Sequence, residues 1–254
     1  MFVDNEVKLD YADVLLVPKE SALTSRAQID LEVDHFDTRV VPIIAANMDG
    51  VGTFEMAKAL GKHKIMTALI KHYSLEELVD FFSLDQESAY AVYTMGTTDD
   101  DYLKFVEFMS RDEISDKEPL AVCIDVANGY SHYMEEFIAK MRDAYPDLVL
   151  MAGSVVTPDR TEKLIECGAD IIKVGIGSGS VCITRSVTGV GYPQLSAVLE
   201  CAAAAESAGG SIIADGGITC PGDAVKAFAA GAKYVMIGGL FAGHREGWED
   251  IDRK

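Results

Sequence analysis

Eight short apolar runs, separated by stretches of helical periodicity, constrain the fold of this 254-residue chain more than any other feature. Each run has the length and the apolar character of a buried strand. Strands that alternate with helical patterns are typical of parallel sheets. The predicted strands are Val40–Ala46, Ile65–Ile70, Tyr90–Thr94, Leu120–Val126, Leu148–Ala152, Ile171–Val174, Ser211–Ala214 and Tyr234–Ile237.

The stretches between these runs place apolar residues three or four positions apart, which predicts helices. The predicted helices are Thr53–Gly61, Leu75–Leu84, Asp99–Arg111, Ser131–Tyr145, Pro158–Cys167, Pro193–Ala208 and Pro221–Ala230. Alternating strands and helices with short loops imply parallel strands and right-handed crossovers, and eight strands close a barrel. Hydrophobic residues make up 49 % of the chain, which is ample for one large core. We therefore predict an α/β protein with a single domain, a (β/α)8 TIM barrel, over residues 1–254.

Several helix ends carry residues suited to those positions. Thr157 followed by Pro158 favours a helix start, and Gly168 and Gly231 favour the position just past a helix end. No eighth helix is predicted after the last strand, because residues 245–254 are few and polar.

Composition narrows the class of ligand. The formal net charge of −19 argues against a nucleic-acid partner, because proteins that bind nucleic acid need a basic face. A phosphate bound to so acidic a chain must be held by backbone N–H groups and a few local cations. No apolar run approaches the ~20 residues that span a bilayer, and the first six residues do not resemble a signal peptide. We expect no membrane partner.

The five cysteines indicate a reducing compartment. They are odd in number and lie scattered through the chain without the spacing of metal ligands. Four of them, at positions 123, 167, 201 and 220, lie in apolar or helical patterns and are predicted to be buried thiols rather than disulfides. A cytoplasmic location fits this usage.

The fifth cysteine, Cys182, lies in a glycine-rich loop between the sixth strand and the next helix. Glycines at 175, 177 and 179 allow the backbone to pass close to a ligand and to direct several N–H groups at one point. Backbone dipoles near a cysteine favour the thiolate, which is the nucleophilic form. The alternative is a flexible loop with a chance cysteine. The loop lies between a strand and a helix, where barrels carry their active sites, and this position favours an active-site cysteine.

Other strand ends carry further candidate residues. Gly216-Gly217 and Gly238-Gly239, after the last two strands, form the pattern of a phosphate-binding site in barrels, to which Ser180 can add a hydroxyl. Asp125 and Asn128 suit a nicotinamide or a hydrogen-bond network, although Asn128 can equally cap a helix. Two other strand-end interpretations stay open: Asn47 and Asp49 as helix caps, and the Lys71-His72 pair as solvated surface residues.

The loop pattern Gly-x-Gly-x-Gly-Ser-x-Cys-x-Thr at 175–184 resembles the active-site loop of the IMP dehydrogenase / GMP reductase family. The continuation Thr188–Gln194, Thr-Gly-Val-Gly-Tyr-Pro-Gln, resembles the reductase branch. The resemblance extends from about Leu9 to Arg245. Ser178 is a departure, since the family commonly has proline there, and we expect serine to make the loop less rigid.

The resemblance implies NADPH-dependent reductive deamination of GMP to IMP, with release of ammonia. Cys182 is the implied nucleophile that attacks C2 of the purine and forms a covalent thioimidate. Thr184 is implied to handle protons on the departing amine together with a glutamate of a mobile flap. Family members continue past this chain's last residue with that flap and a final helix. We therefore expect a barrel that is C-terminally incomplete, with a naturally short form as the alternative.

The resemblance also implies the contact residues and the assembly. Potassium is implied at the carbonyls of Gly177, Gly179 and Cys182, and the family implies a homotetramer. The implied GMP contacts are Met48, Ser180, Asp215, Gly216, Gly217, Gly238 and Gly239. The implied NADPH contacts are Ser25, Arg26, Lys71, Asp125, Val126, Ala127, Ile176 and Gly177. For Ser25 and Arg26, contact with the cofactor of a neighbouring subunit is left open.

Two other functions compete with this interpretation. IMP dehydrogenases use the same cysteine, but they usually carry a regulatory insertion after the second strand, for which this chain has no room. The second competitor is a non-catalytic purine-nucleotide-binding barrel that kept the phosphate site and lost the flap.

Overall fold

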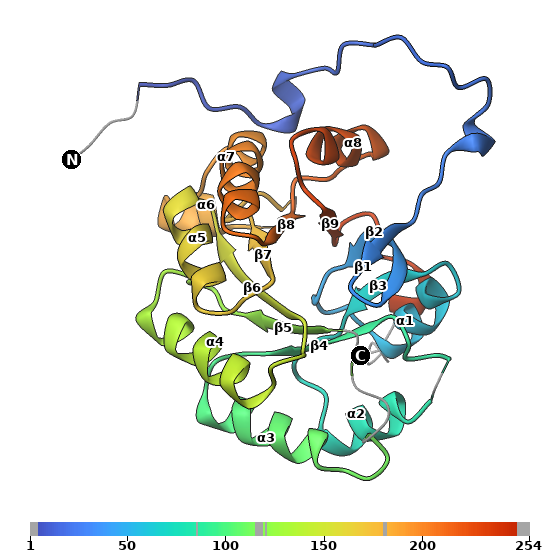
Figure 1. The fold of residues 1–254 in the computed structure, drawn as a ribbon, viewed down its shortest axis with the longest axis vertical. Coiled ribbons are helices and arrows are strands. Elements are labelled where there is room, and N and C mark those ends of the chain that lie inside the picture. Colours follow the sequence, from blue (N-terminus) through green and yellow to red (C-terminus); the bar gives the residue numbers. More distant parts are fainter. Residues whose placement is uncertain (1–4, 85, 115–118, 120, 180–181, 248–254) are drawn as a thin grey trace, which may run out of the picture.

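The computed structural model describes residues 5–84, 86–114, 119, 121–179 and 182–247. Within these residues, eight parallel strands pair in chain order, and the pairing of the first with the last closes a barrel (Figure 1). The predicted (β/α)8 barrel is confirmed, and each predicted strand lies within three residues of its observed bounds. These strands are β2 Thr38–Ala45, β3 Ile65–Ala68, β4 Ala91–Met95, β5 Ala121–Asp125, β6 Leu150–Val155, β7 Ile171–Val174, β8 Ser211–Asp215 and β9 Tyr234–Ile237.

Helices surround the barrel, and the seven predicted helices are present with ends that agree within two residues. Residues at both ends of the helices explain several of these bounds. At a start, Thr53 accepts a hydrogen bond from the N–H of Met56; past an end, Gly168 has a φ of +113°. The helices are α1 Phe54–Gly61, α2 Leu75–Phe82, α3 Asp99–Met109, α4 His132–Ala144, α5 Pro158–Glu166, α7 Gln194–Ser207 and α8 Pro221–Ala229.

Five short elements were not predicted from sequence. The prediction of a loop around Thr184 was wrong in part, because that residue begins a five-residue helix, α6 Thr184–Thr188. A helix this short has no detectable periodicity, and Gly189 ends it with a φ of +71°. The others are strand β1 Val33–His35, antiparallel to β2, and the 3-10 helices η1 Tyr11–Asp13, η2 Arg26–Gln28 and η3 Arg245–Gly247.

The core consists of two apolar layers, one inside the barrel and one between the strands and the helices. Alternation along each strand divides its side chains between them. On β7, Ile171 belongs to the inner layer and Ile172 and Val174 belong to the outer one. The same alternation places Lys173 inside the barrel, at the carboxyl end of β7.

The N-terminal segment crosses α7 and α8 before it turns away from the barrel (Figure 1). Leu9 exchanges two hydrogen bonds with Ser196, and Lys226 donates to the carbonyl of Tyr11 at 2.7 Å. From Val14 to about Leu31 the chain then forms an exposed arm that includes η2. Among the residues described, no helix combines the length and the hydropathy needed to cross a bilayer.

We predict that Gly168→Ala destabilises the fold more than Gly209→Ala. Both glycines have φ values, +113° and +81°, that cost an alanine about 1–2 kcal/mol. At Gly168 the new Cβ would also lie 2.8 Å from Cβ of Arg142, whereas nothing lies within 4 Å at Gly209. Overpacking adds about 1–3 kcal/mol. Urea unfolding measures both variants, and equal losses would contradict the packing argument.

Candidate active site

Two adjoining cavities open at the carboxyl ends of the strands, and Met48 lines both. The first, here called the glycine pocket, has a volume of about 190 Å³ and is lined by Ala46, Met48, Gly175, Gly177, Ser178, Gly179, Cys182, Asp215, Gly216, Gly217, Ile218, Met236, Ile237, Gly238 and Gly239. The second, here called the lysine pocket, has a volume of about 350 Å³ and is lined by Asn47, Met48, Asp49, Ile70, Lys71, His72 and Asp125.

Cys182 lies on the wall of the glycine pocket and is exposed. Its Sγ lies 3.2 Å from Oγ1 of Thr184, and its backbone N–H donates to the carbonyl of Gly179 at 3.0 Å. Hydrogen bonds from the hydroxyl and the backbone N–H of Thr184, with the nearby Arg185 cation, lower the pKa of the Cys182 thiol. The site therefore favours a thiolate that is open to a ligand.

Arg185, one residue after Thr184 in α6, explains two of the glycines around this cysteine. A Cβ at Gly177 would lie 2.5 Å from Cγ of Arg185, and a Cβ at Gly191 would lie 2.7 Å from the same atom. The guanidinium donates to the carbonyl of Tyr192 and lies 3.6 Å from the carboxylate of Asp10. Arg185 thus packs the loop that carries Cys182 against the segment that leads into α7.

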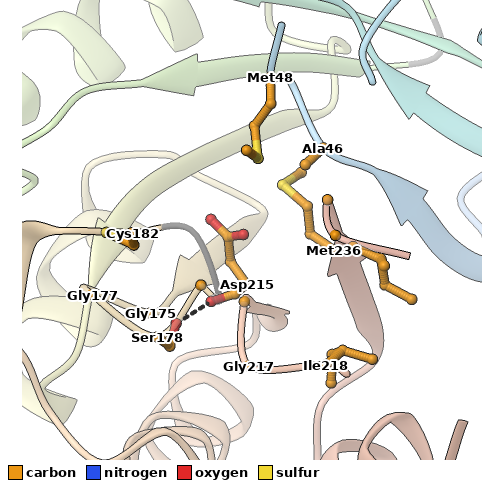
Figure 2. Close-up of a pocket in the computed structure, with 15 residues that line it drawn as sticks. Ala46, Met48, Gly175, Gly177, Ser178, Cys182, Asp215, Gly217, Ile218 and Met236 are labelled. Carbon is orange, nitrogen blue, oxygen red and sulfur yellow. Dashed lines mark hydrogen bonds between the residues drawn. The ribbon is translucent and has the colours of Figure 1, made fainter. Parts of the chain in front are cut away.

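Asp215, the last residue of β8, directs its carboxylate into the space that Cys182, Met48 and Met236 surround (Figure 2). Its backbone carbonyl accepts hydrogen bonds from Oγ of Ser178 at 2.9 Å and from Nε2 of Gln194 at 3.2 Å. The expectation that Ser178 makes the loop less rigid overlooked this hydrogen bond, which connects the loop to β8.

A buried cation beneath both pockets was missed from sequence. Lys173 is 2 % exposed, and its ammonium contacts the carboxylate of Asp125 and lies 3.4 Å from that of Asp215. It lies in an apolar run, which predicted only a buried strand. The available indication was the alternation that puts Lys173 on the same face as Ile171.

The charges in this cluster shift one another's pKa values. Burial disfavours the ammonium of Lys173, but Asp215 and Asp125 outweigh it and raise the pKa. Burial also disfavours the carboxylate of Asp125, yet Lys173 and a hydrogen bond with Asn47 bring its pKa below the usual value. The pKa of Asp215 is raised by burial and by Asp125, which Lys173 offsets only in part. Burial raises the pKa of the neighbouring Cys123 thiol to about 12.

The predicted phosphate-binding glycines, Gly216, Gly217, Gly238 and Gly239, all line the glycine pocket. Its lining residues include no lysine, arginine or histidine within the described part of the chain, so an anion there would bind backbone N–H groups. Ser180, which was predicted to add a hydroxyl, lies outside the described residues.

Met48, the predicted purine contact, lies against the second of these glycine pairs. A Cβ at Gly238 would lie 2.6 Å from its Sδ. The glycine therefore leaves room for the methionine side chain at the junction of the two pockets.

Of the eight residues predicted to contact the cofactor, three line one of the two pockets and five do not. Lys71 and Asp125 line the lysine pocket, and Gly177 lines the glycine pocket. Neither pocket is lined by the other five. Ile176 packs partly buried against the outer layer, and Val126 and Ala127 follow Asp125 in the loop. Ser25 and Arg26 lie at η2 on the exposed arm, where Oγ of Ser25 accepts the N–H of Ala27.

The predicted potassium ligands, Gly177, Gly179 and Cys182, all line the glycine pocket. Their backbone carbonyls are hard oxygen ligands of the kind a monovalent cation takes. The carbonyl of Gly179 accepts the N–H of Cys182 and retains a second lone pair. Within the described residues, no group of three histidine, cysteine or acidic side chains could hold a metal ion.

Comparisons with known proteins agree with this geometry. Residues 8–251 match the model of the IMP dehydrogenase / GMP reductase domain. A GMP reductase from Vibrio cholerae is 51 % identical over 97 % of this chain and 72 % of its own length. One from Vibrio parahaemolyticus is 50 % identical over 100 % of this chain and 74 % of its own length.

Among solved structures, inosine 5′-monophosphate dehydrogenase from Legionella pneumophila superposes with a TM-score of 0.83 and 34 % identity. The superposition covers 93 % of this chain and 71 % of that one. The barrel, the glycine-rich loop with Cys182 and the sequence similarity thus lead to one conclusion: the chain belongs to the IMP dehydrogenase / GMP reductase family.

Proposed function

We propose that this chain catalyses the NADPH-dependent reductive deamination of GMP to IMP, with release of ammonia. Relatives about 50 % identical over nearly the whole chain are named GMP reductase. The observation that carries the proposal is Cys182, hydrogen-bonded to Thr184 in one pocket with Asp215 and two glycine pairs. A nucleophile, a carboxylate and phosphate-binding backbone in one cavity suit a purine nucleotide.

In the proposed complex the glycine pocket holds GMP. Backbone N–H groups of Gly217, Gly238 and Gly239 bind the phosphate, since the pocket lining offers no cation for it and the N–H of Gly216 donates to the carbonyl of Met236 at 3.4 Å. The carboxylate of Asp215 accepts hydrogen bonds from the ribose hydroxyls, and Met48 packs beside the purine. This arrangement leaves C2 of the base near Cys182.

Covalent capture then divides a difficult displacement into two easier steps. The Cys182 thiolate forms a bond to C2, and the C2–amine bond breaks as the nitrogen takes a proton and leaves as ammonia. Hydride addition to C2 and cleavage of the S–C2 bond release IMP and restore the thiolate. In sum, GMP, NADPH and two protons give IMP, NADP⁺ and ammonium.

Thr184 and the lysine pocket have separate tasks in this scheme. Thr184 stabilises the thiolate through its hydroxyl and its backbone N–H, and it moves a proton toward the departing amine. When bound, NADPH supplies the hydride. Lys71 and Asp125 would hold it in the lysine pocket, which adjoins the glycine pocket at Met48.

Three further proposals concern the surroundings of the reaction. We propose a potassium ion at the carbonyls of residues 177, 179 and 182, which a potassium-dependent rate would support. We propose a homotetramer, because the arm exposes Leu15, Val17 and Leu31 by 87, 82 and 67 %. Light scattering measures that assembly. We also propose a cytoplasmic location, because all five cysteines are free thiols.

The proposed reaction predicts a defined stoichiometry. Loss of NADPH absorbance should require GMP, and one ammonia should appear for each NADPH oxidised. Formation of NADH from IMP, with no reaction of GMP, would instead identify a dehydrogenase. Binding of GMP without turnover would identify a nucleotide-binding protein.

Cys182→Ala should abolish turnover and leave the GMP dissociation constant within about tenfold, equal to ~1.4 kcal/mol. The phosphate and ribose contacts lie on other residues, so binding should survive. Calorimetry and the NADPH assay measure the two effects. Cys220→Ala is the matched control, because Cys220, wrongly predicted to be buried, is also exposed but lines neither pocket. An active Cys182→Ala beside an inactive Cys220→Ala would overturn the assignment.

Alkylation by iodoacetamide should reveal the lowered pKa of Cys182. Because only the thiolate reacts, the rate should persist to a lower pH than for an ordinary thiol with a pKa near ~8.5. Thr184→Val removes the hydroxyl donor and should shift the pH profile upward. The same alkylation measured on Cys182→Ala gives the contribution of the other four thiols, which is subtracted. An unchanged midpoint in Thr184→Val would show that the hydroxyl does not stabilise the thiolate.

A further inference from the structure

We propose that Lys173 is a positioning residue that holds the carboxylates of Asp215 and Asp125 and thereby couples ligand binding in the glycine pocket to ligand binding in the lysine pocket. The inference rests on the proposed function, because it takes GMP and NADPH as the two ligands. Lys173 lines neither pocket, so it acts only through the two carboxylates.

The sheet register brings the three charges together. Asp125 on β5 pairs with Gly153 on β6, and Gly153 pairs with Lys173 on β7. Gly153 thus lies between the lysine and the first carboxylate, and a Cβ there would lie 2.5 Å from Cβ of Lys173. The missing side chain leaves a path across β6. Asp215 lies on β8, the strand on the other side of β7.

Burial makes this contact obligatory for the lysine. The side chain of Lys173 is 2 % exposed, whereas those of Asp125 and Asp215 are 28 % and 23 % exposed. An ammonium removed from water must be paired, so it holds both carboxylates close. Without it, the carboxylates of Asp125 and Asp215 would repel each other across the barrel interior.

The two carboxylates have different neighbours above the lysine. Asp215 lines the glycine pocket and is hydrogen-bonded by Ser154, while Asp125 lines the lysine pocket and is hydrogen-bonded by Asn47. Each can accept hydrogen bonds from one ligand. Lys173 is their shared counter-ion, so the first ligand fixes the lysine and with it the second carboxylate. The second ligand then binds an ordered site, which gives positive coupling.

The test measures binding in a Cys182→Ala background, where GMP and NADPH are present together without turnover. Calorimetry gives the GMP dissociation constant with and without saturating NADPH. With Lys173 present, we expect NADPH to tighten GMP binding at least fivefold. Lys173→Met should weaken each ligand alone at least tenfold and bring the coupling factor close to one. Lys173→Arg should restore part of the coupling, because it keeps a cation between the carboxylates.

A second variant and a control separate positioning from stability. Gly153→Ala keeps every charge but displaces the lysine, so it should also reduce the coupling, and it decides the question if Lys173→Met does not fold. Arg142→Met removes a cation that binds Asp170 at the opposite end of the barrel and should leave the coupling unchanged.

Distinct outcomes identify which idea fails. The coupling proposal is overturned if the background chain shows no coupling, or if Lys173→Met or Gly153→Ala retains it. An equal loss in Arg142→Met would also overturn it. If the background chain binds neither GMP nor NADPH, the proposed function fails instead.

Discussion

Closure of the barrel by the parallel pairing of β2 with β9 is the constraint on which the rest of the structure depends. An open sheet of parallel strands would expose two unpaired edges, whereas the closed sheet satisfies the backbone of each strand on both sides. Closure also brings the first and last strands side by side. Met48, after β2, can therefore share a pocket with Gly238, after β9, although 190 residues separate them in sequence.

The same arrangement reconciles an acidic protein with a phosphorylated ligand. A net charge of −19 repels phosphate at long range, but short-range binding depends on local dipoles. Seven glycines line the glycine pocket, and Asp215 is the one acidic residue among its described lining residues. That carboxylate is partly neutralised from below by Lys173, which adds a positive charge without exposing it to solvent.

The sequence predicted those strands and helices whose apolar residues follow a regular pattern imposed by packing. The barrel strands are apolar runs because both faces are buried, and the helices carry a clear period because one face packs on the barrel. Gly168 and Gly231 were correctly predicted past the ends of α5 and α8, with φ values of +113° and +100°. Their conformation is nearly exclusive to glycine, so the residue type was informative.

The failures share a different cause. Helix α6 is too short to show a helical period in its sequence. The ion pairs of Lys173 depend on which residues lie opposite it in the closed sheet. Residue type alone cannot supply the register that sets Gly153 between Lys173 and Asp125. The roles of Ser25 and Arg26 stay predictions that rest on resemblance, since both residues lie on the exposed arm and line neither pocket of their own chain.

The backbone carbonyl and the side chain of Asp215 have separate roles. Its carbonyl oxygen receives Ser178 and Gln194, which set the path of the nucleophile loop and the start of α7, while its carboxylate faces the cavity. The architectural contacts are thus independent of the side chain, because every residue type has a carbonyl. Evolution could therefore exchange the side chain at this position, and with it the proposed contact with the ribose, without dismantling the loop that carries Cys182.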